Sequence, residues 1–219
     1  MAATLAGPVL EPASGGPARQ LVVLLHGYGA DGNDLIELGR EWARSLPHAA
    51  FVAPNAPDRC AESSFGLQWF PLTFRDPDEY ERGVRQAGPV LDAFLDAELA
   101  RRGLDDSALA LVGFSQGTML ALHVAPRRKR QPAAVVGFSG HLADAQSLKE
   151  QVRVRPPVLL VHGDRDELIP VQALLLAAQG LAAAGIPVEW HISPGLGHGI
   201  DPRGLALAAD FLKRAFVPS

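Results

Sequence analysis

The sequence predicts a single three-layer α/β domain built on a mostly parallel central sheet. Short apolar runs alternate with segments of helical period along the chain, and most of these runs are continuously apolar. Such runs are typical of strands buried on both faces of a parallel sheet, joined by right-handed helical crossovers. With 219 residues, 47% of them hydrophobic and 20% charged, the chain can bury one substantial core.

The pattern predicts six strands and five helices. The strands are expected at residues 21–25, 50–53, 108–112, 133–136, 158–162 and 188–192. The helices are expected at residues 33–46, 79–101, 116–124, 171–184 and 204–216. Residues 1–20, rich in Pro, Gly and Ala, are expected to form a short edge strand and a loop. No repeat and no linker divides the sequence, so residues 1–219 are predicted to form one domain.

Composition argues against several classes of partner. The formal net charge is −4 and no basic stripe dominates, so binding to nucleic acid is not expected. The basic cluster at residues 127–130 follows a predicted helix and is expected to be a solvated helix end. No apolar run reaches membrane-spanning length, so stable membrane insertion is not expected.

Cysteine usage and the N-terminal residues favour a cytoplasmic location. Cys60 is the only cysteine, so an intrachain disulfide is excluded. We expect Cys60 to be a free structural thiol. The N-terminal stretch lacks the basic and apolar regions of a signal peptide, since its first cation is Arg19. The oligomeric state stays open, with a homodimer as one option.

The third predicted strand leads into Gly113-Phe114-Ser115-Gln116-Gly117, which is followed by a predicted helix. A strand, a Gly-x-Ser-x-Gly turn and a helix form the context of a nucleophile elbow. The tight turn strains the backbone and exposes the hydroxyl, and the flanking glycines let strand and helix approach closely. Ser115 is therefore the predicted nucleophile.

A serine nucleophile needs a base and an acid, and both are expected at the ends of later strands. His198, between Gly197 and Gly199, follows the last strand and is the predicted base. Asp164 and Asp166 both follow the fifth strand. Asp166 is preferred as the histidine's partner because residues 166–170 resemble the acid turn of such hydrolases, and Asp164 is expected to stabilise the turn. The order Ser, Asp, His is that of an α/β-hydrolase.

The tetrahedral intermediate also needs oriented backbone N–H donors for its oxyanion. Gln116, directly after the nucleophile, is one predicted donor. Tyr28, in the glycine-rich loop after the first strand, is the other. His26 is expected to brace that loop rather than to transfer protons.

Two motifs compete with this interpretation. Residues 27–32 fit the Gly-x-Gly-x-x-Gly pattern of a dinucleotide site, but the next strand ends without the acidic residue that binds a ribose. Ser139 also follows a strand, but His141 replaces the closing glycine of an elbow, so Ser139 is expected to be structural. No Cys or His spacing suggests zinc. We therefore expect neither a cofactor nor a metal.

Together, four segments resemble the phospholipase/carboxylesterase family of α/β-hydrolases, which includes the acyl-protein thioesterases. They are the loop at residues 25–32, the Phe-Ser-Gln-Gly form of the elbow, the turn at residues 162–166 and Gly197-His198-Gly199. The resemblance implies the same triad of Ser115, Asp166 and His198, the same oxyanion donors, Tyr28 and Gln116, and no separate cap domain. Thr118 is a departure, since many relatives have a glycine there.

The acyl pocket is expected near an apolar loop. Residues 61–75 contain Trp69, Phe70 and Leu72, and the resemblance places the Trp-Phe region beside the acyl pocket; these residues could equally cover the sheet edge as core. Leu168, in the turn of Asp166, is grouped with them as substrate-binding. Phe65 and Phe74 of the same loop lie outside the residues that the structure describes.

The predicted function is hydrolysis of carboxylic esters through an acyl-enzyme intermediate, acting on a small ester or acyl substrate. Cleavage of acyl-protein or other thioesters uses the same triad and is the main alternative. Two other functions are less favoured than these two: a non-catalytic binding module on the same fold, and an NAD- or FAD-dependent oxidoreductase.

Overall fold

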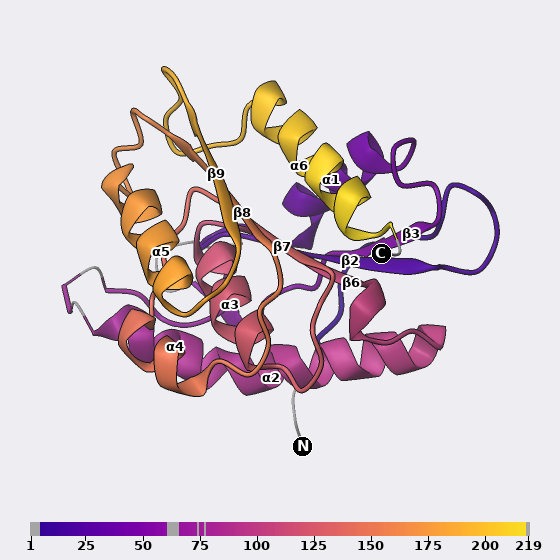
Figure 1. Cartoon of the computed structure of the whole chain (residues 1–219), viewed down its shortest axis with the longest axis horizontal. Helices are drawn as coiled ribbons and strands as arrows, with labels where there is room; N and C mark the ends of the chain where they lie inside the picture. The colour runs from indigo at the N-terminus through magenta and orange to yellow at the C-terminus, as the bar shows by residue number, and fades with distance from the viewer. Residues whose placement is uncertain (1–4, 61–65, 74, 77, 218–219) are drawn as a thin grey trace.

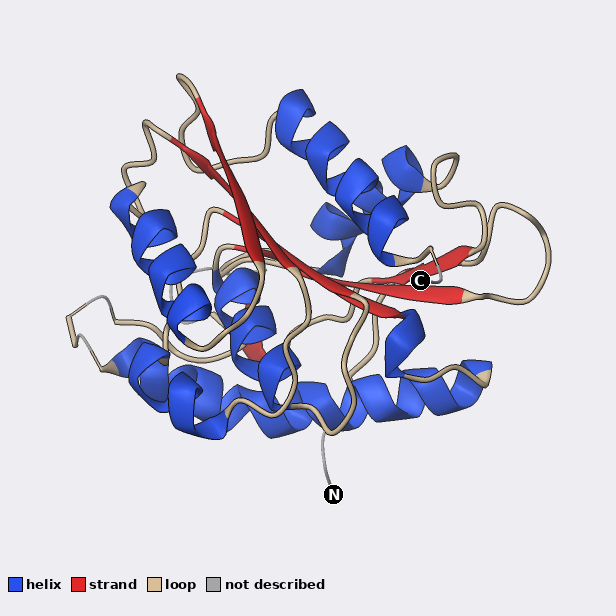
Figure 2. Ribbon diagram, in the orientation of Figure 1, coloured by secondary structure: helices blue, strands red, loops and turns tan. Residues whose placement is uncertain are grey.

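The computed structural model describes residues 5–60, 66–73, 75–76 and 78–217. Within these ranges the central sheet has seven strands in the order β1-β3-β2-β6-β7-β8-β9 (Figure 2). Only the short edge strand β1 runs antiparallel to its neighbour, β3; all other neighbours are parallel. The predicted fold class is therefore confirmed. The strands are β1 (Val9–Leu10), β2 (Gln20–Leu25), β3 (Ala49–Val52), β6 (Leu109–Phe114), β7 (Ala134–Phe138), β8 (Val158–Gly163) and β9 (Val188–Ser193).

Helices cover both faces of the sheet and complete the three layers (Figure 1). One face carries α1 (Gly32–Trp42) and α6 (Pro202–Ala215), and the other carries α2 (Glu79–Arg102), α3 (Gln116–Val124), α4 (Ala145–Gln151) and α5 (Gln172–Ala183). The apolar core is divided accordingly into two clusters of buried side chains, one on each face of the sheet. None of the helices described is both long enough and apolar enough to cross a membrane.

A short helix and a small hairpin are among the elements that were not predicted. Helix α4 has only seven residues, and its N-cap residue, Asp144, makes no side-chain capping bond. The hairpin of β4 (Asp58–Arg59) and β5 (Leu67–Gln68) has two residues in each strand. Both elements are too short to produce a hydrophobic period, so their position depends on contacts with the rest of the fold.

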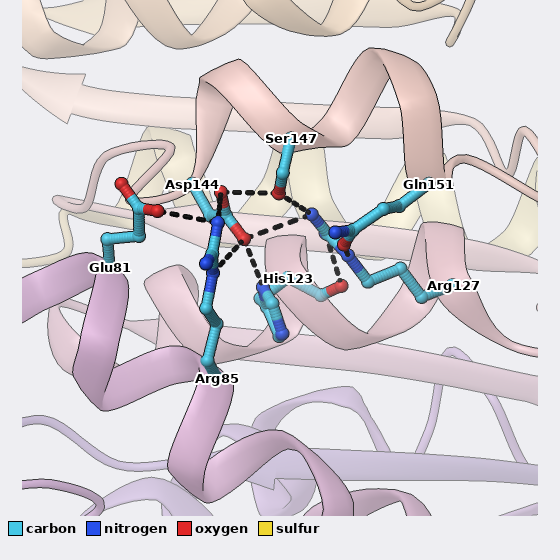
Figure 3. Close-up of polar contacts among 7 residues, drawn as sticks. All are labelled: Glu81, Arg85, His123, Arg127, Asp144, Ser147 and Gln151. Carbon is cyan, nitrogen blue, oxygen red and sulfur yellow. Dashed lines mark hydrogen bonds and ion pairs between the residues drawn. The ribbon is translucent and has the colours of Figure 1, made fainter.

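Asp144 nevertheless ties α4 to the helices beside it (Figure 3). Its buried carboxylate accepts hydrogen bonds from Arg85 of α2, at 3.2 Å, and from Arg127, which follows α3, also at 3.2 Å. Ser147 of α4 and His123 of α3 complete the contacts. We call this network the Asp144 clasp; its members are Glu81, Arg85, His123, Arg127, Asp144, Ser147 and Gln151.

The prediction that residues 127–130 form a solvated helix end is wrong for half of the cluster. Arg127 belongs to the clasp, and Arg128 is only 5% exposed. Arg128 pairs with Asp92 at 2.5 Å, with Asp96 at 2.8 Å and with Asp106. Two carboxylates of α2 and a third from the turn before β6 contact one guanidinium, and a local charge pattern does not indicate these contacts. Lys129 and Arg130 are exposed, as predicted.

Candidate active site

Ser115 lies on the tight turn between β6 and α3, with a φ of 52° and a ψ of −114°. This is a strained conformation for a residue with a side chain. The turn is held by the Ser115 N–H, which donates to the Phe138 carbonyl at 2.9 Å. A Cβ at Gly117 would lie 2.0 Å from the Leu25 carbonyl oxygen, so only glycine fits there. The expected strand–elbow–helix unit is thus present.

His198 and Asp166 meet above the sheet from two different loops. Asp166 lies between β8 and α5, His198 lies between β9 and α6, and His198 Nδ1 is 2.7 Å from Asp166 Oδ2. The other carboxylate oxygen accepts the N–H groups of Leu168, at 3.0 Å, and Ile169, at 2.9 Å. Because the carboxylate accepts a hydrogen from Nδ1, the Nε2 atom of His198 is left to accept a proton.

Asp164 has a different position. Its Oδ1 accepts the N–H of Gly195 at 2.6 Å, which connects the two loops that carry Asp166 and His198. Of the two candidate acids, Asp166 is the one that contacts His198, and the Asp164 side chain bonds the neighbouring loop rather than its own turn.

His162, at the end of β8, is a site residue that sequence reasoning missed. It is 1% exposed, and its Nε2 lies 3.1 Å from Asp166 Oδ2 and 2.8 Å from the Ile169 carbonyl oxygen. In the sequence it looks like the last residue of a buried strand. Its spacing of four residues from Asp166 was the available signal, but that spacing indicates a contact only once the turn is known.

Ser115 and His198 line one cavity of about 230 Å³. The predicted oxyanion residues, Tyr28 and Gln116, line it as well, so the structure brings both together with the predicted nucleophile and base. Most of the remaining lining is apolar, and several of its members were not predicted. The other lining residues are Gly27, Ala30, Leu72, Tyr80, Phe114, Met119, Leu168 and Ile169.

Of the four predicted substrate-binding residues, Leu72 and Leu168 line this cavity and Trp69 and Phe70 do not. Trp69 is 3% exposed and donates its indole N–H to the His26 carbonyl at 2.9 Å, and Phe70 is 1% exposed. These two aromatic side chains are core residues beneath the site. Leu168, by contrast, is 74% exposed at the edge of the cavity.

The side chain of Gln116 explains why Trp69 and Phe70 are buried. Its Oε1 accepts the Trp69 N–H at 2.8 Å, and its Nε2 donates to the Phe70 carbonyl at 2.8 Å. Gln116 is fully buried, so this pair of hydrogen bonds fixes the 69–70 backbone against the elbow. The role of this side chain was not predicted from the sequence.

His26 braces the glycine-rich loop, as predicted. Its Nε2 accepts the Ala56 N–H at 3.0 Å, and its Nδ1 lies 2.8 Å from the Gly27 carbonyl oxygen. An imidazole that accepts at one nitrogen and donates at the other is neutral. Burial favours this state and lowers the pKa of His26.

Ser139 and Thr118 hydrogen-bond to backbone carbonyl groups next to the elbow and next to His198. Ser139 has a φ of 48° and lies 3.0 Å, Oγ to carbonyl oxygen, from Gly199, the neighbour of His198. Thr118 Oγ1 lies 2.8 Å from the carbonyl oxygens of Gly113 and Phe138. The threonine that departs from the family pattern therefore occupies the space behind the elbow. Ser139 is structural, as predicted.

Within the part of the chain that the structure describes, no group of three or more His, Cys, Asp and Glu side chains is placed to hold a metal ion. Cys60 is a buried free cysteine.

A parallel α/β sheet with a serine on a strand-to-helix elbow, followed in the chain by an acid and a histidine that contact each other, defines the serine hydrolases of the α/β-hydrolase type. Residues 9–216 match the model of the Phospholipase/Carboxylesterase family, and the chain belongs to this family.

Relatives and solved structures agree with this assignment. Esterase YpfH of Escherichia coli (strain K12) is 29% identical over 197 residues, covering 90% of this chain and 83% of the relative. Acyl-protein thioesterase 1 of Gibberella zeae is 24% identical over 214 residues, covering 90% and 91%. The crystal structure of esterase PE8 superposes with a TM-score of 0.94 at 44% identity, covering 97% of this chain and 100% of the other. The chain is a carboxylic ester hydrolase.

Proposed function

We propose that the chain hydrolyses small carboxylic esters through an acyl-enzyme formed on Ser115, with His198 as general base and acid and Asp166 as its partner. The observation that carries this proposal is the 2.7 Å contact between His198 and Asp166 beside a cavity that Ser115 and His198 both line. The contact selects the Nδ1–H tautomer, which makes Nε2 available to the serine hydroxyl.

In the first half of the reaction, Ser115 Oγ attacks the ester carbonyl carbon while His198 Nε2 takes the hydroxyl proton. The carbonyl oxygen becomes an oxyanion, for which we assign the backbone N–H groups of Tyr28 and Gln116 as donors. When the carbon–oxygen bond to the alcohol breaks, His198 gives its proton to the departing alkoxide. The acyl group is then bonded to Ser115.

In the second half, a water molecule replaces the alcohol. His198 takes one of its protons as the water oxygen attacks the acyl carbon, and the same two N–H groups receive the second oxyanion. The bond to Ser115 Oγ breaks, and the proton on His198 returns to that oxygen. A carboxylic acid leaves and the free enzyme is restored, so no cofactor is consumed.

Thioester hydrolysis is the second candidate, because one relative is named as an acyl-protein thioesterase. The proposed steps are the same, with a thiolate in place of the alkoxide. Esters are favoured because the relative of highest identity among those named above is called an esterase. Matched octanoyl esters and thioesters, compared by kcat/KM, separate the two preferences.

The test of the proposed function is labelling by a fluorophosphonate probe together with hydrolysis of p-nitrophenyl acetate. Ser115→Ala should lose both signals. Ser107→Ala is the matched control, since Ser107 lies before β6, at the other end of that strand, and its hydroxyl contacts Asp105. Intact labelling and hydrolysis in Ser115→Ala would overturn the mechanism.

The cytoplasmic location stays a prediction, and the homodimer stays one option for the oligomeric state. The homodimer is checked by sedimentation equilibrium, and the location by fractionation of the source cells.

A further inference from the structure

The central sheet ends at a long edge strand. β9 pairs with β8 on one side, and no strand among the described residues pairs with its other side (Figure 1). The opposite edge of the sheet is β1, which has only two residues, whereas β9 has six. An edge strand of this length offers unpaired N–H and C=O groups to another chain.

The backbone groups on the open side of β9 belong to alternate residues. At one end of the ladder the Val158 N–H donates to the Pro187 carbonyl at 2.9 Å, and at the other end the Asp164 N–H donates to the Ser193 carbonyl at 3.2 Å. Odd-numbered residues of β9 therefore direct their backbone groups to β8, and even-numbered residues direct theirs to the open side. The latter are Val188, Trp190 and Ile192.

This outward set of donors and acceptors stops at both ends of the strand. The next even-numbered residue after it is Pro194, which has no N–H to donate. The residue at the corresponding position before it is Ile186, whose N–H already donates to the Leu181 carbonyl at 3.0 Å. The set therefore consists of three residues, with Trp190 at its centre.

A second copy of this chain matches the set by twofold symmetry. In an antiparallel pair, two residues that lie directly opposite each other exchange both N–H···O=C hydrogen bonds. A twofold axis at Trp190 places this residue opposite its own copy and Val188 opposite the partner's Ile192, so each outward N–H meets a C=O. Any other antiparallel register leaves some of these groups without a partner.

The side chains on the α5 face suit the same register. Val188 and Ile192 pack against the core cluster on this face, so Trp190, between them, lies on it too. Trp190 is nevertheless 53% exposed, which is unusual for a large aromatic side chain. Pairing across the axis brings the two indole rings together and removes apolar area from water.

The side chains on the α6 face are complementary in that register. It places Glu189 opposite the partner's His191, twice by symmetry. Glu189 is exposed and pairs with Arg214 of α6 at 2.9 Å, and His191 Nε2 is buried without a hydrogen-bond partner among the residues described. A carboxylate thus faces an imidazole on each side of the axis, and no two like charges lie directly opposite each other.

We propose that β9 is the interface of a homodimer, in which two copies pair antiparallel about Trp190 and their sheets join into one. A closed, isologous contact of this kind uses the same strand on both subunits and leaves no free β9 edge. The proposal concerns assembly and does not depend on the proposed esterase function.

Sedimentation equilibrium of the full chain over a wide range of concentrations measures the dimer directly. Trp190→Lys places two like charges opposite each other and should raise the dimer Kd about a hundredfold or more. Trp190→Pro removes an outward N–H that β8 does not use, so it should raise the Kd as well and keep the β8–β9 ladder. Far-UV circular dichroism and the urea unfolding midpoint show whether each variant is folded.

Leu176→Lys is the matched control. Leu176 is 67% exposed on α5, but it lines a hollow together with Ala145 of α4 and so faces away from the edge of the sheet. Its Kd should stay within about twofold of the wild-type value. A wild type that stays monomeric at every concentration would overturn the proposal. So would a dimer whose Kd is unchanged in both folded Trp190 variants.

Cysteine cross-linking tests the register. Trp190→Cys places two thiols on directly opposite residues, whose Cα atoms are about 5.5 Å apart, within the reach of a disulfide. Oxidised glutathione should therefore link the two subunits. Glu189→Cys is the control, because its two copies are about 8 Å apart in this register and should not be linked. The native Cys60 is buried. Cross-linking at position 189 but not at 190 would overturn the register.

Discussion

His162 Nε2 lies 3.1 Å from Asp166 Oδ2, the same oxygen that His198 Nδ1 contacts at 2.7 Å. The carbonyl oxygen of Ile169 lies 2.8 Å from the same nitrogen. Because both neighbours of Nε2 are acceptors, this nitrogen carries a hydrogen and shares it between them. Asp166 is thus surrounded by two backbone N–H groups on one oxygen and two imidazoles on the other, and His162 is a positioning residue for the acid.

Replacing His162 tests that positioning role. His162→Leu removes the donor and leaves the Asp166 carboxylate and the Ile169 carbonyl short of a partner. We expect kcat for p-nitrophenyl acetate to fall about tenfold or more with little change in KM, because the loss acts on the orientation of His198. His162→Gln offers an amide N–H near the position of Nε2 and should recover part of the loss.

A double-mutant cycle separates this effect from general damage. If His162 acts through Asp166, His162→Leu should have little further effect on kcat in an Asp166→Asn background. Independent losses that multiply would show that His162 does not act through the acid.

The two carboxylates after β8 should respond differently to amidation. An Asn at position 166 offers its N–H₂ to His198 and favours the wrong tautomer, so kcat should fall by about four orders of magnitude. Asp164→Asn keeps an oxygen for the Gly195 N–H and should lose less than about tenfold. Steady-state kinetics on p-nitrophenyl acetate measure both. A larger loss at position 164 would exchange the two roles.

Gln116 should matter for stability as well as for the elbow. Gln116→Leu leaves the Trp69 N–H and the Phe70 carbonyl buried without their partner, at a cost of about 1–3 kcal/mol for each group. Urea unfolding should therefore show a free energy of unfolding lower by about 2–6 kcal/mol. A difference below about 0.5 kcal/mol would mean that water or another group replaces the amide.

The fold and the placement of the proposed catalytic residues could be predicted because their signals are local. A continuous apolar strand, the Gly-x-Ser-x-Gly turn and the following helix occupy one stretch of sequence, and Ser115 lies within it. His198 and Asp166 follow later strands, and the carboxyl ends of parallel strands meet at the same edge of a sheet. Nothing beyond strand order was needed to bring these three residues to one edge.

The residues around them depend on contacts between distant segments. Trp69 and Phe70 have the composition of a pocket wall, but the buried amide of Gln116 holds their backbone beneath the site. Likewise, His162 has the pattern of a strand residue, and Arg128 has the pattern of a solvated cation. In each case polar partners decide the position: the Gln116 amide for residues 69–70, Asp166 and the Ile169 carbonyl for His162, and three carboxylates for Arg128. Neither periodicity nor local charge indicates these partners.

The ion pairs of Arg128 give a stability prediction with a control in the next residue. Arg128→Met leaves three carboxylates without their cation, including the mostly buried Asp106, and should lower the free energy of unfolding by about 3–5 kcal/mol. Lys129→Met, at an exposed position, should change it by less than about 0.5 kcal/mol. Equal, small effects would show that the carboxylates are well solvated once Arg128 is gone.

His123 is expected to make the fold sensitive to acid. Its ring is buried in the Asp144 clasp, and Nδ1, which is 3.5 Å from Asp144 Oδ2, has no hydrogen-bond partner among the residues described. Burial first, and then the neighbouring charge of Arg127, lower the pKa of His123 from 6.5 to about 4. Although burial works in the other direction, hydrogen bonds from Arg85 and Ser147 hold the pKa of Asp144 below its ordinary value, so that carboxylate stays charged in this range.

The direction in which stability changes with pH follows from the number of protons that the folded and unfolded chains bind. Between pH 6.5 and about 4 the unfolded chain binds a proton at His123 that the folded chain does not, so stability falls as the pH falls. The shift corresponds to about 3 kcal/mol across this window. His123→Gln, which does not titrate, should lose about 3 kcal/mol less unfolding free energy than the wild type between pH 6.5 and about 4, measured by urea unfolding at several pH values. His26 and His141, whose pKa values are also lowered, contribute to the wild type and the variant alike. Parallel curves for the two proteins would show that His123 becomes protonated in the folded clasp without cost.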